Sequence, residues 1–594
     1  MKTSGSFYVR DIKDSRLLMK VASGEEKADM AIINAKLLNV YSGELLDQHS
    51  IGIKGKWIAC VGDDLGDVIG QQTKVIDAKG QTVIPGLIDG HTHLLWFITP
   101  YEFLKHAIKG GTTTVITETL EAFPVGGYKG VTDFLSSINE QPIKIFATAT
   151  TMPSISKTAR GAPMETIQKL LGRSDILGMG ETYWQSVLKE PDRLLPIHHE
   201  TLRFGKVLEG HSAGAKGKKL MAYIASGISS CHEPITAEEA LERLRLGLYV
   251  MIREGSVRRD LEAVSRIKDF GIDLRRLILV SDGLGPKDLI EKGGMEFIVQ
   301  KAIDCGFDPI SAIQMATLNV AEHFSLDGLI GGIAPGRFAD MVIIPDSNTI
   351  DAQYVISEGQ LIAKDGRLLV PPREHTYSSE SLNSIHLPEK LNPSDFKIRV
   401  EKNIKKAEVR IIEQVTSLVT KEAIITLPVV QNEIRADVSR DILKVAAIDR
   451  THCPGKMFVG FVKGFHMHRG AFATSGAWDT SDIIVVGTSD EDMAVAVNRI
   501  HDIQGGVVVS ANKEIIAEFP LPILGILSDL PVEMVLQKME EVNMAVLALG
   551  IPFNDPLTTL AVLTTAAIPY LRICEEGLVD LRNDITLEVI VDHP

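Results

Sequence analysis

Two histidines separated by one residue follow an apolar run near residue 90, and together they could bind a metal ion. The run is VIPGLIDGHTHLLW, residues 83–96, and it contains His91 and His93. On a β-strand, residues two apart point to the same side, so both imidazoles would face one ion. An isolated HxH is weak evidence, because most histidines are surface or hydrogen-bonded residues. A metal site therefore needs further ligands from elsewhere in the chain.

Residues 84 to about 325 repeat one unit, in which a short apolar strand ends in polar residues and is followed by a helical stretch. Eight strand ends fit the pattern: LIDGHTH, TTTVITE, KIFATAT, ILGMGE, KVLEGH, GISSCHE, LYVMIRE and LILVSD. Eight such units predict an α/β fold, a (β/α)8 TIM-like barrel. In that fold the catalytic groups gather at the carboxyl ends of the strands.

The predicted barrel brings six candidate metal ligands to one cavity. They are His91, His93, Glu181, His211, His232 and Asp282, on the first, fourth, fifth, sixth and eighth strands. Four imidazoles and two carboxylates suit one or two divalent ions such as Zn²⁺, Mn²⁺, Fe²⁺ or Co²⁺, which Glu181 is placed to bridge. Such a pair would lower the pKa of a bridging water and supply hydroxide at neutral pH. The alternative to a metal-binding role is that Glu181 and Asp282 are structural carboxylates at the carboxyl end of the barrel.

The remaining histidines are expected to have ordinary structural or surface roles. Nine of them lie in predicted helices or loops: His49, His106, His198, His199, His323, His375, His386, His501 and His593. His466 and His468 form a second HxH, but nearby strand ends offer few partners. We predict a local structural or pocket-lining role for this pair.

Composition limits the class of protein and of partner. The 594 residues are 45% hydrophobic and 23% charged, which is typical of a soluble globular protein. A formal charge of −15 disfavours nucleic acid and anionic membranes as partners. The five cysteines show no CxxC spacing, which favours a reducing cytoplasm. The polar N-terminus resembles no signal peptide, and no apolar run approaches the roughly 20 residues of a membrane span.

Strand-rich segments flank the predicted barrel, and a polar stretch separates it from the last two hundred residues. We expect an N-terminal extension, a β-sandwich built from both flanks, the barrel, a linker and a C-terminal α+β domain. The corresponding ranges are 1–27, 28–83 with 328–372, 84–327, 373–394 and 395–594. The C-terminal domain is expected to pack over the barrel mouth and help shape the pocket.

These motifs resemble the amidohydrolase superfamily and, within it, the adenine deaminase family. The superfamily resemblance covers about residues 28–370, through PGLIDGHTH, the spaced His211 and His232, and Asp282 after a strand. Closer similarity to adenine deaminases lies in GTTTVI, GHSAGAKGKKLMAYIASGISSCHE, EEALERLRLGLYVMIREGS, MATLNVAEHFSLDGLIGGIAPGRFADMVI, GFVKGF, DIIVVGTSDEDMAVAVNRI and FPLPILGILSD. Together these stretches cover nearly the whole chain from Ala28 onward.

The resemblance implies hydrolytic deamination of adenine to hypoxanthine and ammonia by a metal-activated hydroxide. It implies an amidohydrolase-type barrel, two ions, Mn²⁺ or Fe²⁺ with Zn²⁺ as an alternative, and a homo-oligomer. Glu181 would bridge the ions, Asp282 would move a proton from the attacking oxygen to the departing amine, and Glu233 would protonate a ring nitrogen. The expected catalytic group is Asp282, Glu233 and His232. The expected substrate-binding residues are Glu121, Glu181, Ser212, Arg253 and Trp478.

Four stretches depart from the usual adenine deaminase pattern. Leu-Leu-Trp follows His93 in place of Ile-Glu-Ser, TETLE replaces Ala-Asp-Pro-His-Glu, SDGLGP keeps only the first acidic residue of Asp-Asp-Arg-His, and AWDTSD replaces Ala-His-Asp-Ser-His. The metal ligands are kept, whereas polar groups expected around the substrate become apolar or small. Three alternatives therefore stay open: another aminated or cyclic-amide heterocycle as substrate, a metal-binding inactive paralogue, and a structural protein on the same scaffold.

Overall fold

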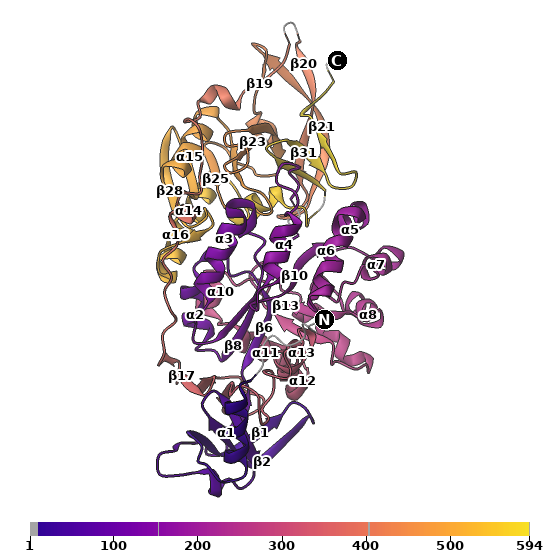
Figure 1. The fold of residues 1–594 in the computed structure, drawn as a ribbon. Helices are drawn as coiled ribbons and strands as arrows, with labels where there is room; N and C mark the ends of the chain where they lie inside the picture. The colour runs from indigo at the N-terminus through magenta and orange to yellow at the C-terminus, as the bar shows by residue number, and fades with distance from the viewer. Residues whose placement is uncertain (1–9, 152–153, 402–403, 569, 593–594) are drawn as a thin grey trace.

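The structure is a computed structural model that describes residues 10–151, 154–401, 404–568 and 570–592. Three parts follow one another along its length (Figure 1): a β-sheet made from both flanks of the barrel, the barrel itself, and the C-terminal region. Among the described helices, none is long and apolar enough to cross a membrane.

All eight predicted barrel strands are present, and each pairs in parallel with its neighbour within one of two sheets. The first sheet contains β6 (Leu87–Thr92), β8 (Thr112–Thr117), β9 (Lys144–Ala149), β10 (Ile176–Tyr183) and β11 (Val207–His211). The second contains β12 (Ser230–Cys231), β13 (Tyr249–Arg253) and β14 (Leu277–Val280). The sequence prediction of the barrel strands is therefore confirmed.

Backbone hydrogen bonds connect the two sheets at both junctions. Between β11 and β12, the amide of Ser229 donates to the carbonyl of Leu208 at 2.9 Å. Beyond the ends of β14 and β6, the amide of Asp282 donates to the carbonyl of His91 at 3.0 Å. The eight strands therefore follow one another in the order of a barrel, with β14 beside β6.

Helices follow the strands and cover them on the outside (Figure 1). They are α2 (Pro100–Ala107), α3 (Ala122–Ile138), α4 (Met164–Leu171), α5 (Trp184–Lys189), α6 (Pro191–Arg203), α7 (Gly217–Ile224), α8 (Ala237–Arg245), α9 (Leu261–Val264), α10 (Pro286–Glu291), α11 (Met295–Asp304), α12 (Pro309–Met315) and α13 (Leu318–His323). Helix α8 shows why such segments are helical: Thr236 caps its first turn by accepting from the amide of Glu239, and basic residues occupy its last turn.

The flanking segments join in one nine-stranded sheet. It contains β1 (Met30–Asn39), β2 (Glu44–Lys54), β3 (Trp57–Gly62), β4 (Lys74–Asp77), β5 (Thr82–Pro85), β15 (Met341–Ile344), β16 (Tyr354–Ser357), β17 (Gln360–Lys364) and β18 (Arg367–Leu368). Strand β15 pairs antiparallel with β5, which stands one residue before the first barrel strand. Helix α1 (Ile12–Ala22) packs beside β3. The sheet is thus anchored directly to the start of the barrel.

The C-terminal region contains an eleven-stranded sheet. Its strands are β19 (Ile398–Arg399), β20 (Lys406–Gln414), β21 (Thr420–Val430), β22 (Glu433–Ile434), β23 (Ile442–Asp449), β24 (Met457–Lys463), β25 (Ala471–Thr474), β26 (Asp482–Gly487), β27 (Gly506–Ala511), β28 (Glu514–Pro520) and β33 (Ile590–Asp592). Its longer helices are α15 (Asp490–Asp502) and α16 (Val532–Ala548), with the short α17 (Pro556–Ala561). A smaller sheet contains β30 (Leu571–Cys574), β31 (Gly577–Asp580) and β32 (Ile585–Leu587).

The C-terminal region is attached to the barrel beside the HxH motif. Strand β7 (Phe97–Ile98), which follows that motif, pairs in parallel with β29 (Leu527–Ser528) of the C-terminal region. Buried side chains of both parts, including Leu95 and Leu521, belong to one hydrophobic cluster. The last two hundred residues therefore pack directly against the barrel end that carries the predicted ligands.

Candidate active site

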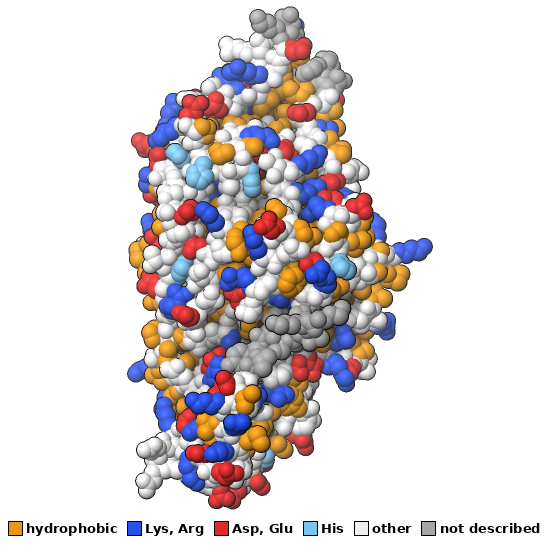
Figure 2. Space-filling model, viewed as in Figure 1, with side chains coloured by type: hydrophobic (Ala, Val, Ile, Leu, Met, Phe, Trp, Pro, Cys, Tyr) orange, Lys and Arg blue, Asp and Glu red, His pale blue; other side chains and the backbone are white. Residues whose placement is uncertain are grey.

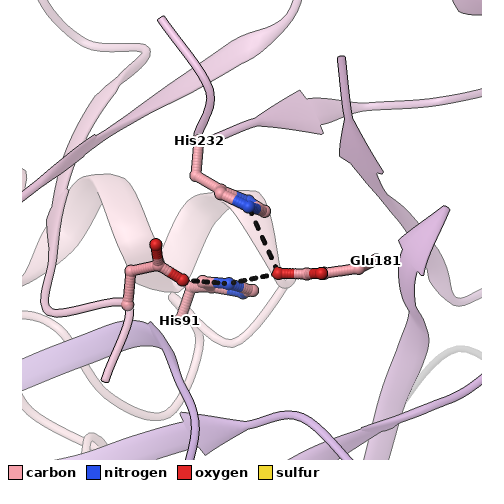
Figure 3. A group of neighbouring side chains, drawn as sticks. His91, Glu181 and His232 are labelled. Atoms are coloured by element: carbon pink, nitrogen blue, oxygen red, sulfur yellow. Dashed lines mark ion pairs between the residues drawn. The ribbon is translucent and has the colours of Figure 1, made fainter. Parts of the chain in front are cut away.

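The six predicted ligands meet at the carboxyl end of the barrel, where one carboxylate oxygen is shared by three imidazoles. Oε1 of Glu181 lies 3.4 Å from Nε2 of His91, 3.4 Å from Nε2 of His93 and 3.2 Å from Nε2 of His232. Figure 3 shows His91, His232 and Glu181 pointing toward one another; His91 lies on β6, Glu181 on β10, and His232 directly follows β12. Oδ1 of Asp282 lies 3.3 Å from Nε2 of both His91 and His93.

His211 completes the arrangement from the next strand. Its Nε2 atom lies 3.2 Å from Oε1 of Glu233, and the same oxygen lies 3.4 Å from Nε2 of His232. The ligand atoms thus form two adjoining groups that share His232, one with His91, Glu181 and Asp282 and one with His211 and Glu233.

This donor set fits a divalent metal centre. A tetrahedral ion with bonds of about 2.0–2.1 Å holds its ligand atoms about 3.3–3.4 Å apart, which is the spacing of His91 and His93 from the oxygens of Glu181 and Asp282. Nε2 of His91 is buried and has no hydrogen-bond partner among the described residues. A buried nitrogen without a partner is costly unless an ion occupies its lone pair.

The backbone fixes where these ligands point. Asp282 follows β14 in a left-handed conformation, with a φ of 51°. The adjacent Ser281 donates through its hydroxyl to Asp89 at 2.5 Å and through its amide at 3.1 Å. Because Asp89 precedes His91 by two residues on β6, these bonds hold the ends of β14 and β6 together. Asp282 and the HxH motif are therefore positioned as one unit.

Arg253 lies between the two carboxylates expected to move protons. Its Nη1 atom donates to Glu233 and lies 3.3 Å from Oδ2 of Asp282, while Nε and Nη2 donate to Asp260 at 3.1 and 2.9 Å. Burial opposes ionisation of Glu233, but Arg253 and the neighbouring imidazoles outweigh it and hold the pKa of Glu233 below its usual value. Burial likewise opposes ionisation of Asp282, yet His91 and His93 keep its pKa well below the usual range. Both carboxylates are therefore ionised at neutral pH.

A second pair of carboxylates stands behind the HxH motif. Glu121, which follows β8, pairs with Nδ1 of His93. Glu118, at the end of the same strand, lies 3.6 Å from Nδ1 of His91 through Oε1 and is 1% exposed. Burial raises the pKa of Glu118 to about 7. The sequence prediction did not include Glu118, although its place at the end of TTTVITE is the signal on which the predicted ligands were chosen.

A cavity of about 550 Å³ opens beside the ligands and is lined by both the barrel and the C-terminal region. Of the predicted substrate-binding residues, Glu181, Arg253 and Trp478 line it. Glu121 and Ser212 are not among the described residues of its lining. Ser212 instead contacts Sγ of Cys231 and accepts a hydrogen bond from the buried Arg243.

The C-terminal region supplies much of the cavity wall, as the sequence predicted. The ring of Trp478 lies 5.1 Å from that of Trp96 and 5.5 Å from that of His93, measured between centroids. The contributing C-terminal residues are Leu418, Val419, Trp478, Thr558, Val562, Thr565, Ala567 and Ile568. An apolar, aromatic wall therefore faces the polar ligand cluster.

Two of the other histidine assignments gain a structural explanation. His323 is buried, and its Nε2 atom is hydrogen-bonded to Oε1 of Glu209 at 2.6 Å, which is a structural contact. His466 of the second HxH is largely exposed and lies near Asp441 at 3.3 Å. Neither His466 nor His468 is among the described residues that line the cavity. His593 lies outside the described residues.

Comparison with known proteins identifies both halves of the chain. Residues 82–363 match the amidohydrolase family, and residues 417–584 match the adenine deaminase C-terminal domain. The chain is 36% identical over 578 residues to an adenine deaminase of Clostridium botulinum (strain 657 / Type Ba4), covering 96% of each protein. It is 37% identical to the adenine deaminases of Moorella thermoacetica, covering 95% of this chain and 96% of that one, and of Staphylothermus marinus, covering 96% and 97%. With this identity over nearly its full length, the chain belongs to the adenine deaminase family of the amidohydrolases.

Proposed function

We propose that this protein hydrolyses adenine to hypoxanthine and ammonia in a centre of two divalent ions. The observation that carries the proposal is the convergence of His91, His93 and His232 on one oxygen of Glu181, in a cavity that Asp282 also lines. The names of the similar proteins give the substrate, adenine.

The donor set would hold two ions, with Glu181 within reach of both. His91, His93 and Asp282 would hold one ion, and His211 and His232 would hold the other. Mn²⁺ or Fe²⁺ is proposed, with Zn²⁺ as the alternative, because mixed imidazole and carboxylate ligands accept all three. When bound, such ions supply the Lewis acidity that makes water a nucleophile at neutral pH.

Asp282 and Glu233 are placed to move the protons of the reaction. Asp282 is ionised and accepts a proton from the attacking water, then gives it to the amine that leaves C6 as ammonia. Glu233, ionised in the same way, takes the other proton of that water and delivers it to a ring nitrogen, so both carboxylates end the reaction ionised as they began. Because the guanidinium of Arg253 contacts both carboxylates, it sets their positions relative to each other. His232 contributes by orienting Glu181 and Glu233.

The cavity wall suits a flat aromatic base. Trp96 and Trp478 meet nearly at right angles, with ring planes 76° apart, and both line the cavity beside His93. An aromatic wall binds a purine by stacking and apolar contact, and exclusion of water strengthens the electrostatic interactions of Asp282 and Glu233. We therefore propose that Trp478 contacts the substrate.

The proposed partner is a small nucleobase rather than nucleic acid. Acidic and basic side chains are interspersed over the face in Figure 2, whereas nucleic-acid sites gather Lys and Arg in one patch. The five cysteines, all within the described residues, carry free thiols, which supports a cytoplasmic location. The family resemblance supports a homo-oligomer, which light scattering would test.

The test is ammonia and hypoxanthine formation from adenine by the full chain, stripped of metal and reloaded with Mn²⁺. The control is Glu233→Gln, which leaves all six predicted ligands in place. We expect turnover in the wild type and a loss of about 10²–10⁴-fold in Glu233→Gln at equal metal content. A wild type that holds two ions but releases no ammonia from adenine would contradict the proposal. Release from another aminopurine or cyclic amide would then identify the substrate.

A further inference from the structure

Each histidine of the HxH motif has a carboxylate on the side away from the ligand cluster. Nε2 of His91 and of His93 faces the oxygens of Glu181 and Asp282, whereas the Nδ1 atoms face the segment that follows β8. Glu121 pairs with Nδ1 of His93, and Glu118 lies 3.6 Å from Nδ1 of His91. An ExxE segment therefore stands directly behind HxH.

Glu118 is a buried carboxylate without a well-aligned hydrogen-bond donor among the described residues. Both of its oxygens are buried, and neither accepts a hydrogen bond of acceptable geometry from the described residues. A buried carboxylate without a donor costs several kcal/mol, as an order of magnitude. Two groups are close enough to relieve this cost: the Nδ1 atom of His91 and the hydroxyl of Thr148, which itself has no hydrogen-bond partner.

The space for Glu118 depends on a glycine. A Cβ atom at Gly180 would lie 1.9 Å from Oε2 of Glu118 and 2.7 Å from Oγ1 of Thr148. Gly180 immediately precedes Glu181 on β10, so the strand that carries the shared ligand also leaves the room for Glu118. A larger residue at position 180 would displace this carboxylate from His91.

The tautomer of His91 decides whether it can bind an ion. A neutral imidazole carries its proton on only one nitrogen, and a metal bound to Nε2 requires that the proton is on Nδ1. A carboxylate at Nδ1 stabilises that tautomer, fixes the ring orientation and raises the basicity of Nε2. Glu118 occupies the position from which it can act on His91 in this way.

We propose that Glu118 is a positioning residue of the metal centre, which accepts a hydrogen bond from Nδ1–H of His91 and thereby keeps Nε2 available as a ligand. Glu121 has the corresponding relation to His93. This inference rests on the proposed metal centre and not on adenine as the substrate.

The experiment measures metal binding rather than turnover. The full chain is stripped with a chelator and titrated with Mn²⁺, and bound metal is counted by elemental analysis. The variant is Glu118→Gln, and its matched control is Glu254→Gln. Glu254 is also buried in the barrel, but it pairs with Lys301 at 2.6 Å. We expect Glu118→Gln to bind at least one ion about 10–100-fold more weakly and the control to bind as the wild type does.

A second variant perturbs the same interaction without changing a charge. Gly180→Ala forces Glu118 away from His91, so the same weakening is expected. If Glu118→Gln does not fold, Glu118→Asp keeps the charge but shortens the side chain, and weaker binding is again expected. Wild-type affinity and two bound ions in these variants would overturn the inference, as would an equal loss in Glu254→Gln. A wild type that binds two ions but leaves adenine unchanged would contradict only the proposed function.

Discussion

The hydroxyl of Tyr183 lies 3.2 Å from each carboxylate oxygen of Asp479, so a barrel strand and the C-terminal region meet in a buried contact. Tyr183 stands two residues after Glu181 on β10, and Asp479 is the neighbour of Trp478. Asp479 also accepts hydrogen bonds from the hydroxyl of Thr565 at 2.6 Å and from the amide of Ala566 at 3.0 Å. One carboxylate therefore links the barrel strand that carries Glu181 to two segments of the cavity wall.

Loss of the Tyr183 hydroxyl should loosen the cavity wall without removing a metal ligand. A buried hydrogen bond to a charged group contributes about 1.5–3 kcal/mol, so Tyr183→Phe should raise the KM for adenine about tenfold or more. Metal content should stay the same, because the phenyl ring still packs beside His211. The matched control is Tyr249→Phe, at the start of β13. Equal KM values in Tyr183→Phe and the wild type would show that the link has no part in substrate binding.

The stability of the protein should depend on the ionisation of Asp479. Burial raises the pKa of Asp479 to about 7, against hydrogen bonds from Thr565 and Ala566 that favour the ionised form. The unfolded value is about 3.9, so the folded state binds more protons between about pH 4 and pH 7. Stability therefore falls as pH rises through this window, by at most about 1.4 kcal/mol per pH unit, and is constant above it.

The measurement is the melting temperature of metal-free wild type and Asp479→Asn between pH 5 and pH 8.5. The neutral amide of the variant cannot titrate in this way. The melting temperature of the variant should therefore rise relative to that of the wild type as the pH increases to about 7, and the difference between the two should stay constant above that pH. Parallel profiles would show that Asp479 does not titrate in this range.

The clustering of the predicted ligands at one end of the barrel follows from their places at the ends of strands. His91 and His211 lie at the ends of their strands and His232 directly follows β12, and parallel strands of a barrel bring their carboxyl ends to one mouth regardless of separation along the chain. The local sequence therefore predicted both the strands and the end of each strand at which the candidate functional residues lie. Glu118 directly follows its strand in the same way, but the sequence prediction did not include it.

The remaining features depend on contacts that no local pattern encodes. Glu121 was predicted to bind substrate, whereas its carboxylate pairs with Nδ1 of His93 and it is not among the described residues that line the cavity. Asp479 meets Tyr183 across 296 residues of chain. Its backbone has a φ of 65°, which the sequence around it does not indicate. The identity of the wall residues beyond Trp478 follows from this long-range packing.

Removal of Arg253 should destabilise the metal-free protein more than the loss of a surface ion pair would. Arg253→Met leaves Glu233, Asp282 and Asp260 without their shared cation, and breaking such a buried group costs about 3–5 kcal/mol. The control is Arg258→Met, which also removes a contact to Asp260 but comes from a half-exposed side chain and should cost at most about 1 kcal/mol. Urea unfolding of the chelated proteins compares the two. Similar losses in both variants would show that Arg253 is not the main compensating charge.

The aromatic wall should contribute to substrate affinity rather than to metal binding. Trp478 is held through its backbone, whose amide donates to Ala561 and whose carbonyl accepts from Thr564, so Trp478→Ala should keep the loop in place. Loss of a stacking face costs about 1–3 kcal/mol per base, which predicts a 10–100-fold rise in KM for adenine with two ions still bound. Trp478→Phe keeps an aromatic face and should restore most of the affinity. A lower metal content in Trp478→Ala would instead assign the ring a role in the metal centre.

Metal removal should lower thermal stability, because the site holds more negative than positive charge. Five carboxylates, those of Glu118, Glu121, Glu181, Glu233 and Asp282, lie beside four imidazoles and the guanidinium of Arg253. A divalent cation relieves this repulsion, and a ligand at 100 times its Kd stabilises by about 2.7 kcal/mol. Mn²⁺ should therefore raise the melting temperature of the chelated protein by several degrees. Mg²⁺ should raise it less, because Mg²⁺ prefers oxygen ligands and dehydrates reluctantly. Equal shifts with both ions would mean that charge alone, and not the imidazoles, holds the metal.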